Sequence, residues 1–340
     1  MPYSLKGRNV LVTGGSRGLG AEICRKFAAE GCNIAINYAN NEAPAQELAK
    51  ELQQKYNVKT VVLKADGGVL SECVNCVQET IKAFGGIDGV IGNAGWTRFT
   101  DFADLDAMSE AEWDKCYAVN VKGQHALIKE ALPTFKKNAE GGFFIITSSI
   151  AGKSLGGSSM AYSVTKAAQL HLMKCVAKVA GEKARINAVL PGLLLTDWGN
   201  EYGPERINAL KEAAVLKKET ELGDCADAYI MLAKNTSITG QNIHVDTNTK
   251  PPARNNLNEK SDTPCNTQTM PSSSTSTQAA STGDLSPTYS INSMPPLSPP
   301  TLQALRFYDD LERKNGRAER REIGPNGIFM KHRVPRCNTM

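Results

Sequence analysis

A tyrosine and a lysine four residues apart, Tyr162 and Lys166, form the pair with the clearest chemical potential in this sequence. Within a helix, residues four apart share one face, so the phenol and the ammonium would be neighbours. A nearby cation favours the phenolate and lowers the pKa of tyrosine from about 10. The pair therefore predicts a proton donor and acceptor that works near neutral pH. Ser149 lies thirteen residues upstream of Tyr162, just after the apolar run 143–147.

A glycine-rich segment near the N-terminus could hold a phosphate. Gly14, Gly15, Gly18 and Gly20 directly follow the apolar run 9–13 and precede a helical pattern. Glycines let the backbone turn tightly and approach a pyrophosphate, whose charge is met by the helix N-terminus. Such turns also end strands for purely structural reasons, but the position between a strand and a helix favours dinucleotide binding.

Both groups need a scaffold that brings distant segments together. Short β-branched runs alternate with longer amphipathic segments from residue 8 to residue 246, which is typical of a parallel sheet with helices on both faces. We expect a single doubly wound α/β domain. The predicted strands are 9–13, 33–37, 60–64, 89–92, 143–147, 186–190 and 242–245. The predicted helices are 18–30, 41–56, 71–84, 110–136, 162–180 and about 205–233.

Three further motifs complete a recognisable set: Gly92-Asn93-Ala94-Gly95, Asn120 in Asn-Val-Lys-Gly, and Pro191-Gly192 followed by Thr196. With the glycine-rich turn, Ser149 and the Tyr162–Lys166 pair, they resemble the short-chain dehydrogenase/reductase family in order and spacing. The resemblance covers roughly residues 5–246. It implies a single Rossmann domain that binds cofactor and substrate together and that assembles as a homodimer or homotetramer through its long helices.

The resemblance also implies catalytic roles. Tyr162 would be the general acid in carbonyl reduction, and Ser149 would hold and polarise the carbonyl. Lys166 would lower the pKa of Tyr162 and hydrogen-bond the nicotinamide ribose. Asn120 would kink its helix and position a water that leads from Lys166 to solvent.

The cofactor contacts follow from the same motifs. Asp66 would contact the adenine ring, Asn93 would line the ribose, and Leu194 and Thr196 would contact the nicotinamide amide. Gly92 departs from the more usual asparagine at its position. The full predicted cofactor-binding set is Gly14, Ser16, Arg17, Gly18, Leu19, Gly20, Asn37, Asp66, Asn93, Ala94, Lys129, Tyr162, Lys166, Leu194 and Thr196. No metal ligands are predicted.

Charge at the end of the second strand discriminates between NAD(H) and NADP(H). A 2′-hydroxyl needs an acidic acceptor there, whereas a 2′-phosphate needs a cation and no nearby carboxylate. Residues 37–41 contain no acid, the first one is Glu42, and Arg17 stands inside the glycine-rich turn. NADP(H) is therefore favoured over NAD(H), and carbonyl reduction is the expected direction.

The substrate is less constrained. Loops expected over the site supply Trp96, Phe99, Trp198 and Tyr202, which suit an apolar, cyclic or aromatic carbonyl compound such as a secondary metabolite, or which simply pack. Two alternatives stay open: an NAD-linked polyol or alcohol dehydrogenase, and an NADP-sensing protein that recruits a protein partner through its C-terminal segment.

Composition separates the C-terminal segment from the domain at 1–246. Residues 247–300 hold nine of the 16 prolines and no Val, Phe or Trp, and 34 of their 54 positions are Ser, Thr, Pro or Asn. Such a stretch cannot build a core, so 247–301 is predicted to be a disordered linker. We expect 302–340 to be a charged, mostly disordered tail, with a marginal helix at 302–321. Cys337 begins a terminal prenylation box that is weakened by Asn338 and Thr339.

Charge and hydropathy exclude several functions. The net charge of +4 resides entirely in residues 301–340, so the domain has no electrostatic support for binding nucleic acid. No run approaches the length of a membrane span, and the N-terminus lacks a signal-peptide pattern. The nine cysteines form no regular framework, which favours reduced thiols and a cytoplasmic location.

Overall fold

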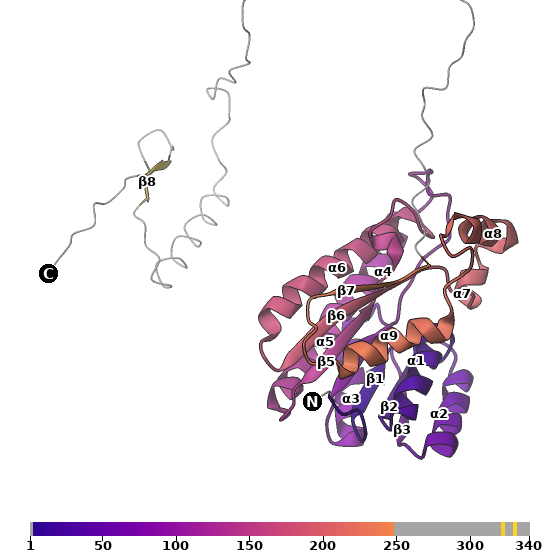
Figure 1. Cartoon of the computed structure of the whole chain (residues 1–340). Coiled ribbons are helices and arrows are strands. Elements are labelled where there is room, and N and C mark those ends of the chain that lie inside the picture. Colours follow the sequence, from indigo (N-terminus) through magenta and orange to yellow (C-terminus); the bar gives the residue numbers. More distant parts are fainter. Residues whose placement is uncertain (1–2, 248–320, 324–328, 332–340) are drawn as a thin grey trace, which may run out of the picture. The chain divides into compact units, whose positions relative to one another are not determined.

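The computed structural model describes residues 3–247, 321–323 and 329–331 (Figure 1). The chain divides into two units, Met1–Lys260 and Ser261–Met340. The first unit carries all of the predicted site residues. None of the helices in the described ranges is long and apolar enough to cross a membrane.

The first unit is built on one parallel sheet of seven strands in the order β3-β2-β1-β4-β5-β6-β7. β1 lies between β2 and β4, with Val10 opposite Ile34 on one side and Gly89 on the other. The chain thus winds outward in both directions from β1, as the predicted doubly wound α/β fold requires. The strands are β1 (Asn9–Val12), β2 (Asn33–Tyr38), β3 (Thr60–Lys64), β4 (Gly89–Gly92), β5 (Gly142–Thr147), β6 (Ala184–Pro191) and β7 (Asn242–Val245).

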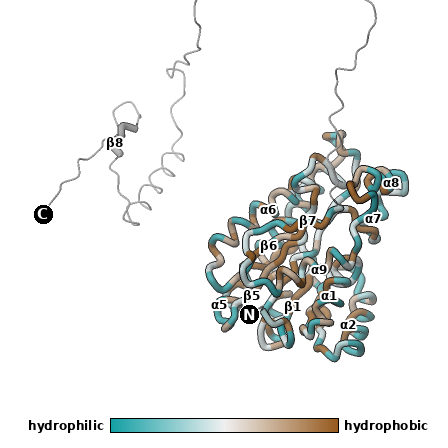
Figure 2. Tube along the Cα trace, in the orientation of Figure 1, coloured by the Kyte–Doolittle hydropathy of each residue, from teal (hydrophilic) through white to brown (hydrophobic). Residues whose placement is uncertain are grey.

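Helices cover both faces of this sheet (Figure 1). One apolar core packs α1, α2 and α9 on the sheet, and a second packs α3, α5 and α6 on the opposite face. The central strands are therefore buried on both sides, which explains their continuous apolar runs. Figure 2 shows this as hydrophobic strands enclosed by helices with hydrophilic outer surfaces. The helices that correspond to predicted ones are α1 (Gly18–Ala29), α2 (Ala43–Tyr56), α3 (Leu70–Phe84), α4 (Glu110–Tyr117), α5 (Gly123–Lys137), α6 (Met160–Ala180), α8 (Gly203–Ala213) and α9 (Leu222–Lys234).

Two predicted helices are each divided. The segment expected to be one helix over 110–136 contains a π-helical turn at Ala118–Lys122, which separates α4 from α5. The segment expected at about 205–233 is interrupted at 214–221 and forms α8 and α9. The short helix α7 (Asp197–Asn200) was not predicted, because four residues are too few for a periodic pattern.

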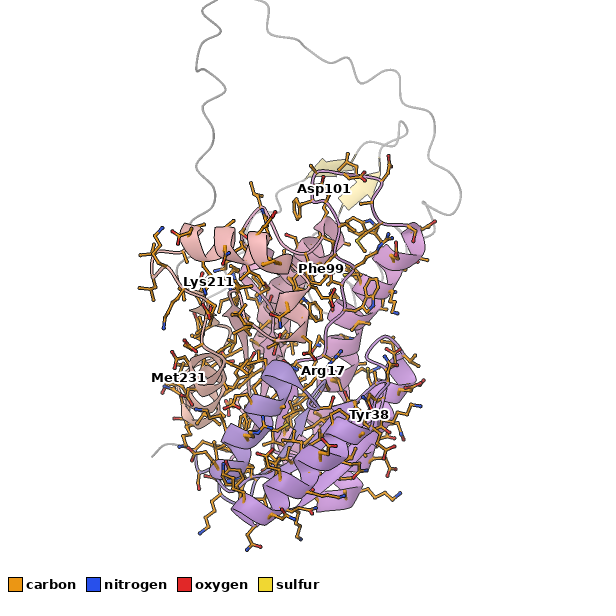
Figure 3. The ribbon with its side chains drawn as sticks, turned by 90° about the vertical axis from the view of Figure 1, so that its right-hand side faces the viewer. Arg17, Tyr38, Phe99, Asp101, Lys211 and Met231 are labelled. Atoms are coloured by element: carbon orange, nitrogen blue, oxygen red, sulfur yellow. The ribbon has the colours of Figure 1, made fainter. Side chains whose placement is uncertain are left out.

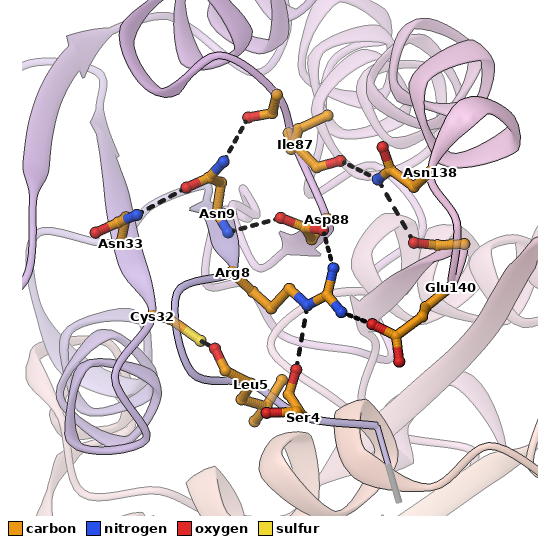
Figure 4. A network of polar contacts seen from close by, with 12 residues as sticks. Ser4, Leu5, Arg8, Asn9, Cys32, Asn33, Ile87, Asp88, Asn138 and Glu140 are labelled. Atoms are coloured by element: carbon orange, nitrogen blue, oxygen red, sulfur yellow. Dashed lines mark hydrogen bonds and ion pairs between the residues drawn. The ribbon is translucent and has the colours of Figure 1, made fainter.

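Polar side chains fasten the strands at the amino edge of the sheet (Figure 4). Asp88, which is 8 % exposed, accepts hydrogen bonds from Arg8 at 3.1 Å and from the backbone N–H of Asn9 at 2.9 Å. Arg8 also pairs with Glu140. Asn33 donates to the Asn9 side chain at 2.9 Å. This network lies at the edge opposite to the functional groups, so its contribution is to stability.

The second unit is described only at two short strands, β8 (Arg321–Ile323) and β9 (Phe329–Lys331), which pair antiparallel. The tail was expected to be mostly disordered and to carry a helix at 302–321. The strand at Arg321 differs from that expectation. The predicted linker at 247–301, the rest of the predicted helix and Cys337 lie outside the described residues, apart from Thr247.

Candidate active site

Most predicted functional residues meet at the carboxyl edge of the sheet, where parallel α/β proteins bind ligands. The glycine-rich turn joins β1 to α1 at this edge. Gly14 and Gly18 adopt the left-handed conformation, with φ values of 59° and 53°. A Cβ atom on Gly20 would lie 2.1 Å from the Gly14 carbonyl oxygen and 2.7 Å from Nδ2 of Asn93. The turn therefore requires glycine for its conformation and for its closest contact.

The N-terminus of α1 is left open by its sequence. Arg17 is the N-cap residue, no side chain caps the helix, and the first turn contains no acid. The free N–H groups and the helix dipole favour an anion, so Ser16, Gly18 and Leu19 are placed where a phosphate fits. The Arg17 side chain is 75 % exposed and forms an ion pair with Asp197 at 3.4 Å (Figure 3).

Asn93 fastens the end of β4 to the glycine-rich turn. Its Nδ2 donates to the carbonyls of Thr13 at 3.0 Å and Gly14 at 3.2 Å. The backbone N–H groups of Asn93 and Ala94 both donate to Oγ1 of Thr13 at 3.0 Å. Thr13 was not among the predicted site residues, although it directly precedes the turn. The Asn93–Ala94 loop and the turn are consequently held as one surface.

Asn37, at the end of β2, is used inside the protein. It is 4 % exposed, and its Oδ1 accepts from the Gly14 N–H at 3.0 Å. Its Nδ2 donates to the carbonyls of Tyr38, Leu63 and Ala65 at 3.1–3.2 Å. The side chain thus shapes the glycine-rich turn from beneath, and its amide has no free group to offer a ligand. The prediction that Asn37 contacts the cofactor is therefore corrected: its side chain supports the glycine-rich turn.

The remaining predicted cofactor residues border the same edge. Asp66 follows β3, and its Oδ1 accepts from the Gly68 N–H at 2.8 Å. Leu194 and Thr196 follow β6. Thr196 caps α7, and its Cγ2 would lie 3.4 Å from a Cβ atom on Gly18. The segment after β6 therefore lies directly over the glycine-rich turn.

Ser149 and Tyr162 face each other across the end of β5. Ser149 follows this strand and accepts the Ala151 N–H at 3.1 Å. Tyr162 lies in the first turn of α6, whose N-cap Ser159 accepts the Tyr162 N–H at 3.2 Å. A side-chain hydrogen bond joins Tyr162 to Ser149. The predicted general acid and the predicted carbonyl-binding hydroxyl are thus in direct contact.

Lys166 is one helical turn further along α6 and is 2 % exposed. Its Nζ donates to the Thr147 carbonyl at 2.8 Å and lies 5.2 Å from the centre of the Tyr162 ring. The same-face arrangement predicted from the four-residue spacing is present. The Thr147 carbonyl, which holds the ammonium, carried no sequence signal because any residue has that group.

Asn120 lies in the π-helical turn and is fully buried. Its Oδ1 accepts the Trp96 N–H at 2.8 Å, and its Nδ2 donates to the Trp96 carbonyl at 2.9 Å and to Thr165 Oγ1 at 3.0 Å. The π-helical turn interrupts the helix at Asn120, where the family resemblance implies a kink. Its backbone carbonyl accepts from Gln169, a buried residue of α6 that is not among the predicted site residues.

Burial dominates the electrostatics of the Tyr162–Lys166 pair. Burial raises the pKa of Tyr162 above its ordinary value, and the hydrogen bond to Ser149 opposes this only in part. Burial also lowers the pKa of Lys166 from 10.5 to about 7. Loss of solvent disfavours both charged forms, and the effect of Lys166 on the pKa of Tyr162 that the family resemblance implies stays a prediction. Tyr162 holds its proton near neutral pH, as a proton donor must.

The lowered pKa of Lys166 predicts a pH-dependent stability. Between about pH 7 and pH 10.5 the unfolded chain binds more protons at this residue than the folded one, so this contribution to the free energy of unfolding rises with pH. Lys166→Met removes it. We expect the stability advantage of Lys166→Met to be largest near pH 7 and to shrink by up to about 1.4 kcal/mol per pH unit as pH rises. Denaturant unfolding at several pH values measures this.

The matched control for that prediction is Lys50→Met, which removes an exposed lysine from α2. Its stability difference from the wild type should not follow pH in this window. Parallel pH profiles for Lys166→Met and the wild type would contradict the expectation.

Aromatic side chains surround the catalytic pair. Trp198 of α7 lies 5.8 Å from the Tyr162 ring, measured between ring centres. Phe99 lies in the loop after β4 (Figure 3). It forms an edge-to-face contact with Tyr202, with 4.9 Å between the ring centres. Trp96 packs in a small apolar cluster with Tyr162. Trp96 and Trp198 therefore lie beside Tyr162, and Phe99 packs on Tyr202.

Lys129 is the one predicted cofactor residue that the structure does not bring to this edge. It is exposed on α5 and lines a surface groove with Leu70, Val74 and Leu172. No other predicted site residue lines this groove. The weak family match placed Lys129 near the cofactor, but its position on the helix directs it to the outer surface. Its assignment as a cofactor contact is therefore corrected.

Comparisons with known proteins agree with this geometry. A family model described as enoyl-(acyl carrier protein) reductase matches residues 14–247. The 3-oxoacyl-[acyl-carrier-protein] reductase FabG of Staphylococcus epidermidis is 32% identical over 241 residues, which cover 70% of this chain and 97% of that protein. Sorbose reductase SOU1 of Candida albicans is 34% identical over 249 residues, covering 72% of this chain and 87% of that protein.

A solved structure gives the same result. The short-chain dehydrogenase of Burkholderia cenocepacia in complex with NADP superposes with a TM-score of 0.67 at 27% identity, covering 73% of this chain and 99% of that one. The strands β2 to β7 and the cluster of Ser149, Tyr162 and Lys166 lie within residues 14–247, the segment that the family model matches. The chain is a member of the short-chain dehydrogenase/reductase family of oxidoreductases.

Proposed function

We propose that this protein is an NADP(H)-dependent reductase that converts a ketone or aldehyde into an alcohol, with Tyr162 as the general acid. The observation that carries this proposal is the contact of the half-buried Tyr162 with the half-buried Ser149, one helical turn from Lys166 and at the same sheet edge as the glycine-rich turn. The names of two relatives, FabG and sorbose reductase, also describe reductases.

The bound nicotinamide would supply a hydride to the carbonyl carbon. Tyr162 then donates its proton to the carbonyl oxygen, and the C=O bond becomes an alcohol C–OH. Ser149 holds this oxygen through its hydroxyl before and during the transfer. Lys166, fixed by the Thr147 carbonyl, lies close enough to favour the phenolate that Tyr162 becomes after donation.

The site fits a nicotinamide dinucleotide in two respects. The uncapped N-terminus of α1 offers free N–H groups to a pyrophosphate, and the tight packing at Gly20 keeps side chains out of that space. Ser16, Gly18, Leu19, Asp66, Asn93, Ala94, Leu194 and Thr196 would border the bound cofactor.

Three features favour NADP(H) over NAD(H). Arg17 is a long, exposed cation beside the turn. Its partner Asp197 is also exposed, so Arg17 can leave this ion pair for a phosphate at little cost in free energy. Glu42, the first acid after β2, is bound by Gln46 at 2.9 Å and by the Tyr38 hydroxyl. It is therefore occupied by other groups. The related Burkholderia cenocepacia structure holds NADP.

Removing the Arg17 charge should separate the two cofactors. We expect Arg17→Ala to weaken NADPH binding about tenfold or more, the scale of one lost charged hydrogen bond, and to leave NADH binding nearly unchanged. Titrations that follow nicotinamide fluorescence measure both dissociation constants. Lys55→Ala, which removes a cation from the last turn of α2, is the control. Equal losses for NADH and NADPH would contradict the 2′-phosphate role.

The aromatic residues around Tyr162 support an apolar, cyclic or aromatic carbonyl substrate. Trp96, Trp198 and the Phe99–Tyr202 pair give flat apolar surfaces beside the proton donor. The decisive experiment supplies purified full-length protein with NADPH and cyclic or aromatic ketones, and in parallel with NAD and polyols. Turnover confined to polyols with NAD favours the alternative dehydrogenase. Cofactor binding without any turnover favours the sensor.

The wider organisation is also a proposal. We propose that the catalytic domain ends near residue 246, because β7 ends at Val245 and the matched family segment ends at 247. We propose further that two or four chains associate through α5 and α6, where Tyr117, Val164 and Val179 are exposed nearby. The native mass tests this. The cytoplasmic location stays a prediction from the sequence.

A further inference from the structure

Gly92 ends β4, and the side chain of Gln124 fills the space that a side chain at position 92 would occupy. A Cβ atom on Gly92 would lie 1.8 Å from Oε1 of Gln124 and 2.9 Å from its Cδ. These separations are far below van der Waals contact, so the amide of Gln124 occupies the space that a side chain at position 92 would use. Gly92 and Gln124 are therefore sterically complementary.

The Gln124 amide also reaches the loop that follows β4. Gln124 lies in the first turn of α5 and is 1 % exposed. Its Nε2 donates to the Ala94 carbonyl at 3.3 Å. On the other side, the Asn93 and Ala94 N–H groups are held by Thr13. The loop is thus fastened from β1 on one side and from α5 on the other.

The buried amide of Gln124 lowers the stability of the fold, so packing alone does not explain its presence. Among the described residues, Oε1 of Gln124 has no hydrogen-bond partner. A buried acceptor without a donor destabilises the folded state by about 1–3 kcal/mol. An apolar side chain of similar length would fill the same space without that cost. The amide is therefore best explained by its bond to Ala94.

We propose that Gln124 is a positioning residue for the cofactor: its amide takes the place of a side chain at position 92 and holds the Asn93–Ala94 loop against the glycine-rich turn. The inference rests on the proposed binding of NADP(H) at this loop. On this inference, α5 influences cofactor affinity through Gln124, although Gln124 need not touch the cofactor.

The first test replaces the amide by an apolar group of similar length. We expect Gln124→Met in the full-length chain to raise the dissociation constant of NADPH about tenfold, while the melting temperature stays equal or rises because the unpaired oxygen is gone. Gln78→Met, which removes an exposed amide bonded to Glu130, is the matched control and should change neither quantity. Fluorescence titration and thermal unfolding provide the two readouts.

The second test moves the amide to the other position. Gly92→Asn alone should destabilise the fold, because the new side chain collides with Gln124. Gly92→Asn combined with Gln124→Ala should recover the melting temperature and NADPH affinity to within about threefold of the wild type. The recovery in the double variant is a coupling that two independent sites would not show.

The outcomes separate this inference from the proposed function. A wild-type chain that binds NADPH, together with Gln124→Met of unchanged affinity, would overturn the positioning role alone. Affinity that falls only in step with the melting temperature would also overturn it, since that result indicates a structural role. A wild-type chain without NADPH affinity would overturn the proposed function, and the inference with it.

Discussion

Tyr162→Phe is expected to lower the rate of carbonyl reduction by about 10²–10⁴-fold while NADPH still binds. The variant loses one oxygen atom, and that atom is the proton donor in contact with Ser149. General acid catalysis contributes roughly 10²–10⁴-fold, and Nζ of Lys166 lies 5.2 Å from the centre of the Tyr162 ring. The ring itself remains, so its packing on Trp198 is retained.

Two measurements make this result interpretable. Consumption of NADPH in the presence of a reducible ketone gives the rate, and fluorescence titration gives the affinity for NADPH. Tyr56→Phe removes a tyrosine hydroxyl from α2, which has no part in the proposed subunit contact, and serves as the control. If Tyr162→Phe retains more than about a tenth of the wild-type rate, another group donates the proton.

Gly20→Ala should weaken cofactor binding about 10- to 100-fold. A single methyl group at this position would meet the Gly14 carbonyl oxygen at 2.1 Å and Nδ2 of Asn93 at 2.7 Å. The first of these is backbone, so the glycine-rich turn itself must move. Overpacking of this kind costs about 1–3 kcal/mol, which corresponds to about 10- to 100-fold in affinity if the binding conformation bears it.

Gly86→Ala provides a matched control with the same chemical change. A Cβ atom on Gly86 would meet no atom within 4 Å, and its φ lies outside the left-handed region. We expect the NADPH affinity and melting temperature of Gly86→Ala to match the wild type. Equal NADPH affinity in both variants would show that the turn does not contact the cofactor.

The sheet could be predicted from sequence because its strands are buried on both faces. Continuous β-branched and apolar runs, such as residues 143–147, have few alternatives in an α/β pattern. The catalytic residues could be predicted because family motifs fix their order and spacing. Their convergence at one edge then follows from the parallel topology.

Other features depended on contacts that no local pattern encodes. The raised pKa of Tyr162 follows from burial by segments distant in sequence, including Trp198. Asn37 appeared to be a cofactor contact from its place after a strand, but its amide is consumed by backbone groups of β2, the β3 end and the turn. The outward position of Lys129 could not be predicted without knowing which face of α5 is exposed.

The π-helical turn at Ala118–Lys122 has an evolutionary consequence. Each residue added to an α-helix rotates everything beyond it by about 100°, because the helix has 3.6 residues per turn. A wider turn absorbs one extra residue locally and leaves the helices on both sides in phase. A single inserted codon is therefore geometrically sufficient to turn Asn120 toward Trp96 and Thr165, without any rebuilding of the apolar faces of α4 and α5.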